Sequence, residues 1–149
     1  MKLYLMRHGQ AAATPQEQEQ TLTIDGQADI KKLAEHLGQQ AVRVDRIFHS
    51  GKKRTLQTAR IIANEIAPAI TLQLHAHIKP NDNPSHILSE IPHWQKDTLI
   101  VSHLPFIPSL LEQLVDDATA VFSIKFEPGT VICLIQENSS WQIEWVITP

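Results

Sequence analysis

The sequence predicts an α/β fold, a three-layer α/β/α sandwich built on a mixed, mostly parallel central sheet. Two observations lead to this prediction. Short apolar runs typical of buried strands occur at residues 3–6, 46–49 and 98–101, and segments with helical spacing of apolar residues lie between them. Strands that alternate with helices favour a parallel or mixed sheet covered by helices on both faces. With 149 residues the chain fits a single domain, residues 1–149.

Three helices are predicted from apolar residues that recur at helical spacing and from residues that start or stop a helix. They cover about Thr23–Leu37, ended by Gly38, then about Lys53–Ile66, and a segment after His103. A short fourth helix is expected at Ser85–Glu90.

Three further strands are predicted near the C-terminus, at Val121–Phe126, Thr130–Gln136 and Trp141–Ile147. The first two are expected to join at a turn made by Pro128 and Gly129. The polar segment Gln16–Gln20 is expected to be a mobile loop.

The composition indicates a compact enzyme without a membrane or nucleic-acid partner. The net charge is −3, and no basic stripe of the kind that binds nucleic acid is present. No apolar stretch approaches the ~18 residues of a spanning helix, and the first apolar run is shorter than the ~7–15-residue core of a signal peptide. We therefore expect a cytoplasmic monomer. The single Cys133 cannot form an internal disulfide and is expected to be buried.

Cationic side chains follow three of the predicted strands. Arg7-His8-Gly9 follows the first, Ser50 to Arg54 follows the second, and Ser102-His103 follows the third. In open α/β sheets ligands bind at the carboxyl ends of the strands, so these residues predict an anion pocket there. Lys52, Lys53 and Arg54 also crowd the start of a helix, where cations are unfavourable unless an anion binds beside them.

The residue types suit phosphoryl chemistry. The forks of Arg7 and Arg54 match phosphate oxygens and stay charged, and a neutral imidazole is a competent nucleophile toward phosphorus. Residue types alone do not decide whether His8 or His103 attacks. The alternative without catalysis is a phosphate-recognition module, which would need the arginines but not both histidines.

These motifs, with Gln57-Thr58-Ala59 after Arg54, resemble those of the histidine phosphatase superfamily, which includes the phosphoglycerate mutases. The short length and the segment Ser102-His103-Leu104-Pro105 are most similar to its small bacterial SixA-type phosphohistidine phosphatases. The resemblance implies a phosphoglycerate mutase-like fold and a phosphatase that acts on a phosphohistidine-bearing signalling protein. It also implies that His8 is the nucleophile and forms a phosphohistidine intermediate, that His103 stabilises the transition state, and that no metal or cofactor is needed.

The sequence departs from the family pattern at two places. Gly51 stands where family members usually have Pro, and the carboxylate general acid of the family has no clear counterpart. Asp82 is the best candidate for that acid, against the alternative of a local Asx turn. The rest of the Pro-rich segment 75–92 is expected to be irregular, and whether it closes on the ligand is left open.

The remaining site candidates are peripheral. Gln10 and Leu104 are expected to line the substrate-binding rim, beside Arg7 and Arg54. His75 and His77 form a possible metal pair, but no further ligand stands at a useful spacing. The alternative substrates are small sugar phosphates and phosphoserine or phosphothreonine.

Overall fold

The computed structural model describes residues 1–149 and is built on a six-stranded sheet with the order β3-β2-β4-β1-β5-β6. The strands are β1 (Lys2–Arg7), β2 (Arg46–His49), β3 (Gln73–Leu74), β4 (Thr98–Ser102), β5 (Val131–Glu137) and β6 (Ser140–Ile147). The pairs β1–β4, β2–β4 and β2–β3 are parallel, and β1–β5 and β5–β6 are antiparallel. The predicted mixed, mostly parallel sheet is therefore confirmed.

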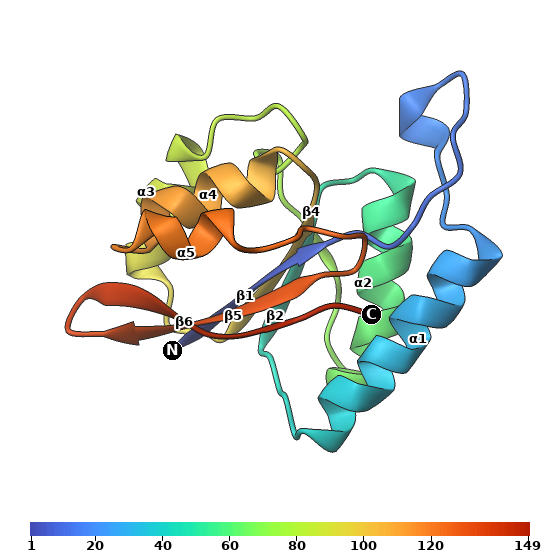
Figure 1. Cartoon of the computed structure of the whole chain (residues 1–149). Helices are drawn as coiled ribbons and strands as arrows, with labels where there is room; N and C mark the ends of the chain where they lie inside the picture. The colour runs from blue at the N-terminus through green and yellow to red at the C-terminus, as the bar shows by residue number, and fades with distance from the viewer.

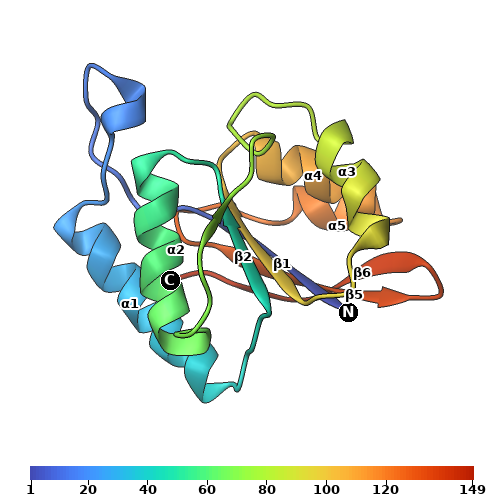
Figure 2. The same cartoon turned by 180° about the vertical axis from the view of Figure 1, so that it is seen from behind.

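Helices cover both faces of the sheet (Figures 1 and 2). Helices α1 (Ile24–Gln39) and α2 (Lys53–Ile66) pack on one face, and α3 (Ser85–Glu90), α4 (Phe106–Leu114) and α5 (Ala118–Phe122) pack on the other. The short 3-10 helices are η1 (Glu17–Glu19) and η2 (Ile91–His93).

The central strands are apolar between their end residues, as expected for strands that are buried on both faces. In β1, Tyr4 and Met6 belong to the core on the side of α1 and α2, whereas Leu3 and Leu5 belong to the core on the other side. None of the helices is long and apolar enough to cross a membrane.

Helix α1 starts as predicted, because the Thr23 hydroxyl accepts a hydrogen bond from the N–H of Gly26 at 2.9 Å. It ends at Gln39, past the predicted end at Leu37. The left-handed residue after this helix is Ala41, with a φ of 56°, whereas Gly38, the predicted stop, lies inside the helix. Gly26 is needed for a different reason, since a Cβ there would lie 2.2 Å from the carbonyl oxygen of Gln10.

The predicted strand at Val121–Phe126 is wrong. Residues 118–122 form α5, because the carboxylate of Asp117 accepts the N–H of Thr119 at 3.0 Å and caps a helical turn that buries Val121. Residues after α5 form a connection in which Gly129, with a φ of 85°, makes the predicted turn. The predictions for α2 and α3 are confirmed, and those for β5 and β6 hold within one residue.

Candidate functional site

The parallel strands β1 and β4 bring two histidines together at their carboxyl ends. Arg7 is the register partner of Ser102, so His8 and His103 follow neighbouring strands at the same level. Their rings meet edge to face with centroids 5.2 Å apart. Strand β2, on the other side of β4, leads through Ser50 into α2, and the first turn of α2 carries Arg54. The sheet thus assembles the four predicted residues from three separate segments.

His8 is held as a neutral imidazole whose Nε2 is unprotonated. Its Nδ1 lies 2.7 Å from the carbonyl oxygen of Gly9, which can only accept, so Nδ1 carries the proton. Its Nε2 accepts a hydrogen bond from Nε of Arg54 at 3.3 Å. Burial lowers the pKa of His8 to about 4, and the charges of Arg54 and Arg7 contribute to this shift. The geometry therefore leaves Nε2 as a nucleophile at neutral pH.

His103 lies beside His8 and is also neutral. Its Nε2 is 2.7 Å from Oγ of Ser50, whereas its Nδ1 is buried and has no hydrogen-bond partner. Burial lowers the pKa of His103 to about 3, and the neighbouring His8 and Arg54 contribute. An unpaired buried nitrogen is costly unless a ligand contacts it.

Arg7 is fixed by the connection between α5 and β5. Its guanidinium donates to the carbonyl oxygen of Phe126 at 2.6 Å, while its Nε is buried without a partner. Burial lowers the pKa of Arg7, but an arginine stays protonated at any working pH. One donor of Arg7 is therefore available to an anion.

Arg54 is nearly buried and is paired with a carboxylate of the chain itself. Glu17 binds the guanidinium through its side chain and, at 3.1 Å, through its backbone carbonyl oxygen. Its other carboxylate oxygen lies 2.5 Å from Nζ of Lys52, and Glu19 pairs with Lys53. Hydrogen bonds from Lys52, first, and from Arg54 lower the pKa of Glu17 to about 2, so the side chain is ionised.

Glu17 was not among the residues predicted from the sequence. The segment Gln16–Gln20, expected to be a mobile loop, contains η1 and is held by ion pairs to the start of α2. The crowded cations at that start predicted an anion, and the chain provides one. The signal in the sequence that could have identified Glu17 is the presence of acidic residues in a short segment between two motifs of the site.

The peripheral candidates lie around this centre and do not contact it by hydrogen bonds. Gln10 is exposed, and its side chain accepts from the Thr23 hydroxyl at 2.9 Å. Leu104 directly follows His103 and is 36% exposed. The carboxylate of Asp82 accepts the N–H of Lys79 at 2.8 Å within its own loop. The carboxylate that the structure brings to the site is therefore that of Glu17.

The two histidines of the possible metal pair, His75 and His77, are engaged elsewhere. Nε2 of His75 lies 2.9 Å from the carboxylate of Glu90, and its Nδ1 accepts the N–H of His77 at 3.1 Å. The ring of His77 stacks on that of His86, with centroids 4.1 Å apart. No cluster of three or more His, Cys, Asp or Glu residues in the structure has the arrangement of a metal site.

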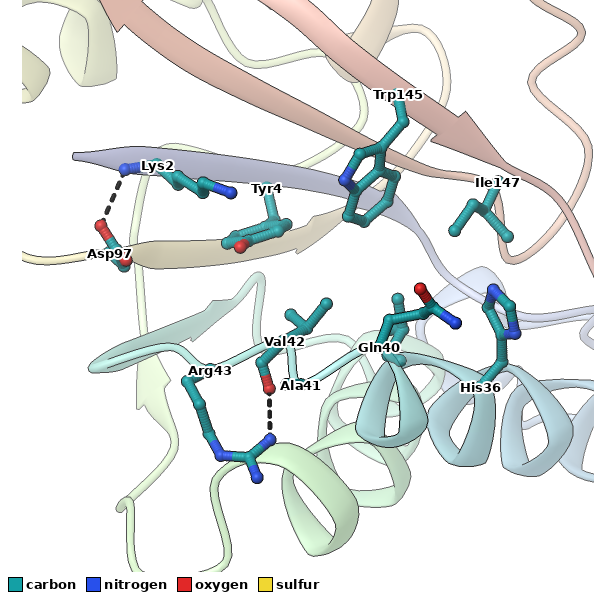
Figure 3. Close-up of a pocket in the computed structure, with 11 residues that line it drawn as sticks. Lys2, Tyr4, His36, Gln40, Ala41, Val42, Arg43, Asp97, Trp145 and Ile147 are labelled. Carbon is teal, nitrogen blue, oxygen red and sulfur yellow. Dashed lines mark hydrogen bonds between the residues drawn. The ribbon is translucent and has the colours of Figure 1, made fainter.

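The largest pocket lies at the opposite edge of the sheet (Figure 3). It encloses about 440 Å³ beside the amino end of β1, between Tyr4 and Trp145 on the sheet and the connection that follows α1. The histidines and arginines described above do not line it. Pocket size alone would therefore select a different place from the one where the four predicted residues meet.

Comparisons with known proteins agree with this geometry. The sequence model of the histidine phosphatase superfamily (branch 1) matches residues 3–79. No curated protein gives a significant match to the sequence.

Among solved structures, the protein histidine phosphatase SixA complexed with tungstate has a TM-score of 0.90 and 20% sequence identity, over 99% of this chain and 97% of that one. A putative phosphohistidine phosphatase SixA from Agrobacterium tumefaciens has a TM-score of 0.85 and 22% identity, over 99% and 97%. A phosphoserine phosphatase from Entamoeba histolytica, in complex with 3-phosphoglyceric acid, has a TM-score of 0.75 and 16% identity, over 99% and 97%. At these identities the similarity concerns the fold.

Proposed function

Because the chain belongs to the histidine phosphatase superfamily, as its motifs predicted, we propose that it is a phosphatase that removes the phosphoryl group from a phosphohistidine on a partner protein. The observation that carries the proposal is the state of His8. Its proton is fixed on Nδ1 by the Gly9 carbonyl, and its unprotonated Nε2 accepts a hydrogen bond from the guanidinium of Arg54, which must move aside for Nε2 to attack.

The reaction proceeds in two displacements at phosphorus. In the first, the lone pair of His8 Nε2 attacks, the bond between phosphorus and the substrate imidazole breaks, and the departing ring keeps the electron pair and takes a proton from solvent. In the second, water attacks the phosphoryl group on His8, and the P–N bond returns its electron pair to Nε2. The proton of the water passes to solvent.

The surrounding donors stabilise the charge on the equatorial oxygens, which is the main requirement of phosphoryl transfer. Arg54 and Arg7 supply guanidinium donors, and His103 supplies a further polar atom that has no partner in the protein. One such donor is typically worth about 3–4 kcal/mol in the transition state.

The state of Glu17 favours phosphohistidine over phosphate esters. An alkoxide leaving group is a strong base and needs a proton in the transition state. The carboxylate at the site is ionised, with a pKa of about 2, and has no proton to give. A phosphohistidine ring whose other nitrogen has been protonated by solvent leaves as neutral imidazole, whose conjugate acid has a pKa of ~6.5, and therefore departs without a general acid from the protein.

Exposed apolar side chains at the rim of the site favour a macromolecular substrate. Leu74, which lies against Gly51 at the end of β2, is 61% exposed, and Leu104 is also exposed on the other side, after His103. Apolar side chains exposed beside cations are suited to contact with another protein's surface.

The test compares the catalytic efficiency for a phosphohistidine protein, a sugar phosphate and a phosphoserine peptide. We expect the phosphohistidine protein to react fastest, and an alkaline quench with labelled substrate to leave the label on His8. His8→Ala abolishes turnover in this scheme, whereas His93→Ala, a change at an exposed histidine outside the site, leaves it intact. A faster ester substrate, or label on any other residue, contradicts the proposal.

A further inference from the structure

Ser50 is a buried residue for which the proposed reaction has so far given no role. Its hydroxyl lies at the junction of β2 and α2, 2.7 Å from Nε2 of His103, and is 1% exposed as a residue. Its Oγ also lies 3.0 Å from Oγ1 of Thr55 and accepts the N–H of Lys52 at 3.3 Å.

The protons of this cluster can be assigned one by one. The Thr55 hydroxyl donates to the carbonyl oxygen of Lys52 at 2.8 Å, so it has no proton left for Ser50. Thr55 Oγ1 also accepts the backbone N–H of Ser50, at 3.3 Å. Ser50 Oγ accepts from the Lys52 N–H, and its own single proton has its shortest contact with Nε2 of His103.

The second ring nitrogen of His103, Nδ1, also restricts where the ring proton can be. Nδ1 is buried and has no partner in the protein, so it is the only polar atom of the ring that is available to a ligand. The burial of this ring and its cationic neighbours keep it neutral, and a neutral imidazole has one proton. With that proton on Nε2, the lone pair of Nδ1 would face the phosphoryl oxygens and repel them.

We propose that Ser50 is a positioning residue that selects the tautomer of His103. Its hydroxyl donates to Nε2 and thereby places the ring proton on Nδ1, where it is donated to a phosphoryl oxygen. This inference rests on the proposed function, because it gives His103 its role at the same site. It also explains why a neutral histidine suffices beside the positive charges of Arg54 and Lys52.

The tautomer is read directly from two-bond ¹H–¹⁵N correlation spectra of the full chain labelled with ¹⁵N-histidine. We expect His103 of the wild-type protein to carry its proton on Nδ1, both free and with tungstate bound as the probe. Ser50→Ala shifts the proton to Nε2 and weakens tungstate binding, measured by calorimetry, on the order of tenfold. Thr55→Val removes the competing acceptor, keeps Ser50, and retains the Nδ1–H form.

The wild-type spectrum tests the proposed tautomer of His103 even if a variant fails to fold. A proton on Nε2, or a doubly protonated His103 in the tungstate complex, overturns the inference. Turnover of phosphohistidine together with either result leaves the proposed function standing and removes only the role of Ser50. The expected tautomers and tungstate affinities, found without turnover, support the role of Ser50 and contradict the proposed function.

Discussion

Glu17→Gln is expected to tighten the binding of tetrahedral anions. In the structure each of the three nitrogens of Arg54 makes one hydrogen bond, Nε to His8 and the two terminal nitrogens to Glu17. A phosphoryl group that binds the fork of Arg54 therefore competes with the Glu17 carboxylate. The glutamine keeps the size of the side chain but removes the negative charge that competes with the ligand.

The expected gain in anion affinity follows from the exposure of Glu17 and Arg54. The side chain of Glu17 is 49% exposed and that of Arg54 is 5% exposed, so the pair is neither fully solvated nor fully buried. Exposed ion pairs contribute about 0.2–1 kcal/mol. Because one partner is buried and Lys52 adds a second contact, we take the upper end of this range. About 1 kcal/mol corresponds to a roughly fivefold tighter dissociation constant.

The assay is calorimetric titration of the wild-type protein and the variants with tungstate, at low and at high salt. Glu19→Gln is the matched control, since it removes the neighbouring ion pair to Lys53 in the same short helix without touching Arg54. We expect Glu19→Gln to bind like the wild type, and the gain of Glu17→Gln to shrink at high salt. Equal or weaker binding by Glu17→Gln would refute the idea that this carboxylate competes with the ligand.

The remaining predictions concern pH, packing and metal dependence. Activity should be lost as the pH falls through about 4, because protonation takes the lone pair of His8 Nε2, and a pH profile of kcat/KM that falls already near 6.5 would contradict this. The folded pKa values of His8 and His103 lie below the unfolded value of ~6.5, so the unfolded state binds more protons there. The free energy of unfolding, measured with urea, should therefore decrease as the pH falls below about 6.5. Gly26→Ala should destabilise the protein by about 1–3 kcal/mol, since the new Cβ would clash with the Gln10 carbonyl. Gly38→Ala meets nothing closer than 3.7 Å and serves as its control; equal urea midpoints for the two variants would contradict the clash. Chelation with EDTA should leave turnover unchanged, because guanidinium and imidazole groups hold the phosphoryl oxygens, and activity restored by a divalent metal would overturn this.

The sequence was sufficient to predict β1, β2, β4, β5 and β6 and the site residues that follow the first three of them, although it missed β3. A short apolar run that ends in charged or polar residues is typical of a buried strand whose end reaches the surface. Parallel pairing then brings His8 and His103 to the same edge of the sheet. The geometry found for Arg7 and Arg54 follows from the same rule, although their roles in the reaction stay predictions.

Other features depend on contacts that no local pattern reveals. A strand was predicted at Val121–Phe126, but the cap at Asp117 and the burial of Val121 favour a helix at residues 118–122. Glu17 reaches Arg54 only because the segment after β1 folds back across the start of α2, which is a tertiary arrangement. Asp82 was considered as an acid because of its residue type, whereas its hydrogen bond belongs to a local turn.

The position of β4 between β1 and β2 has a consequence for how the protein is made. The first two long strands to leave the ribosome are not neighbours in the finished sheet, since each pairs with a strand that is synthesised later. Until Thr98–Ser102 emerges, both strands expose unpaired edges with apolar side chains, which is the state most prone to aggregation. We therefore expect the nascent chain to be most prone to aggregation before β4 is complete.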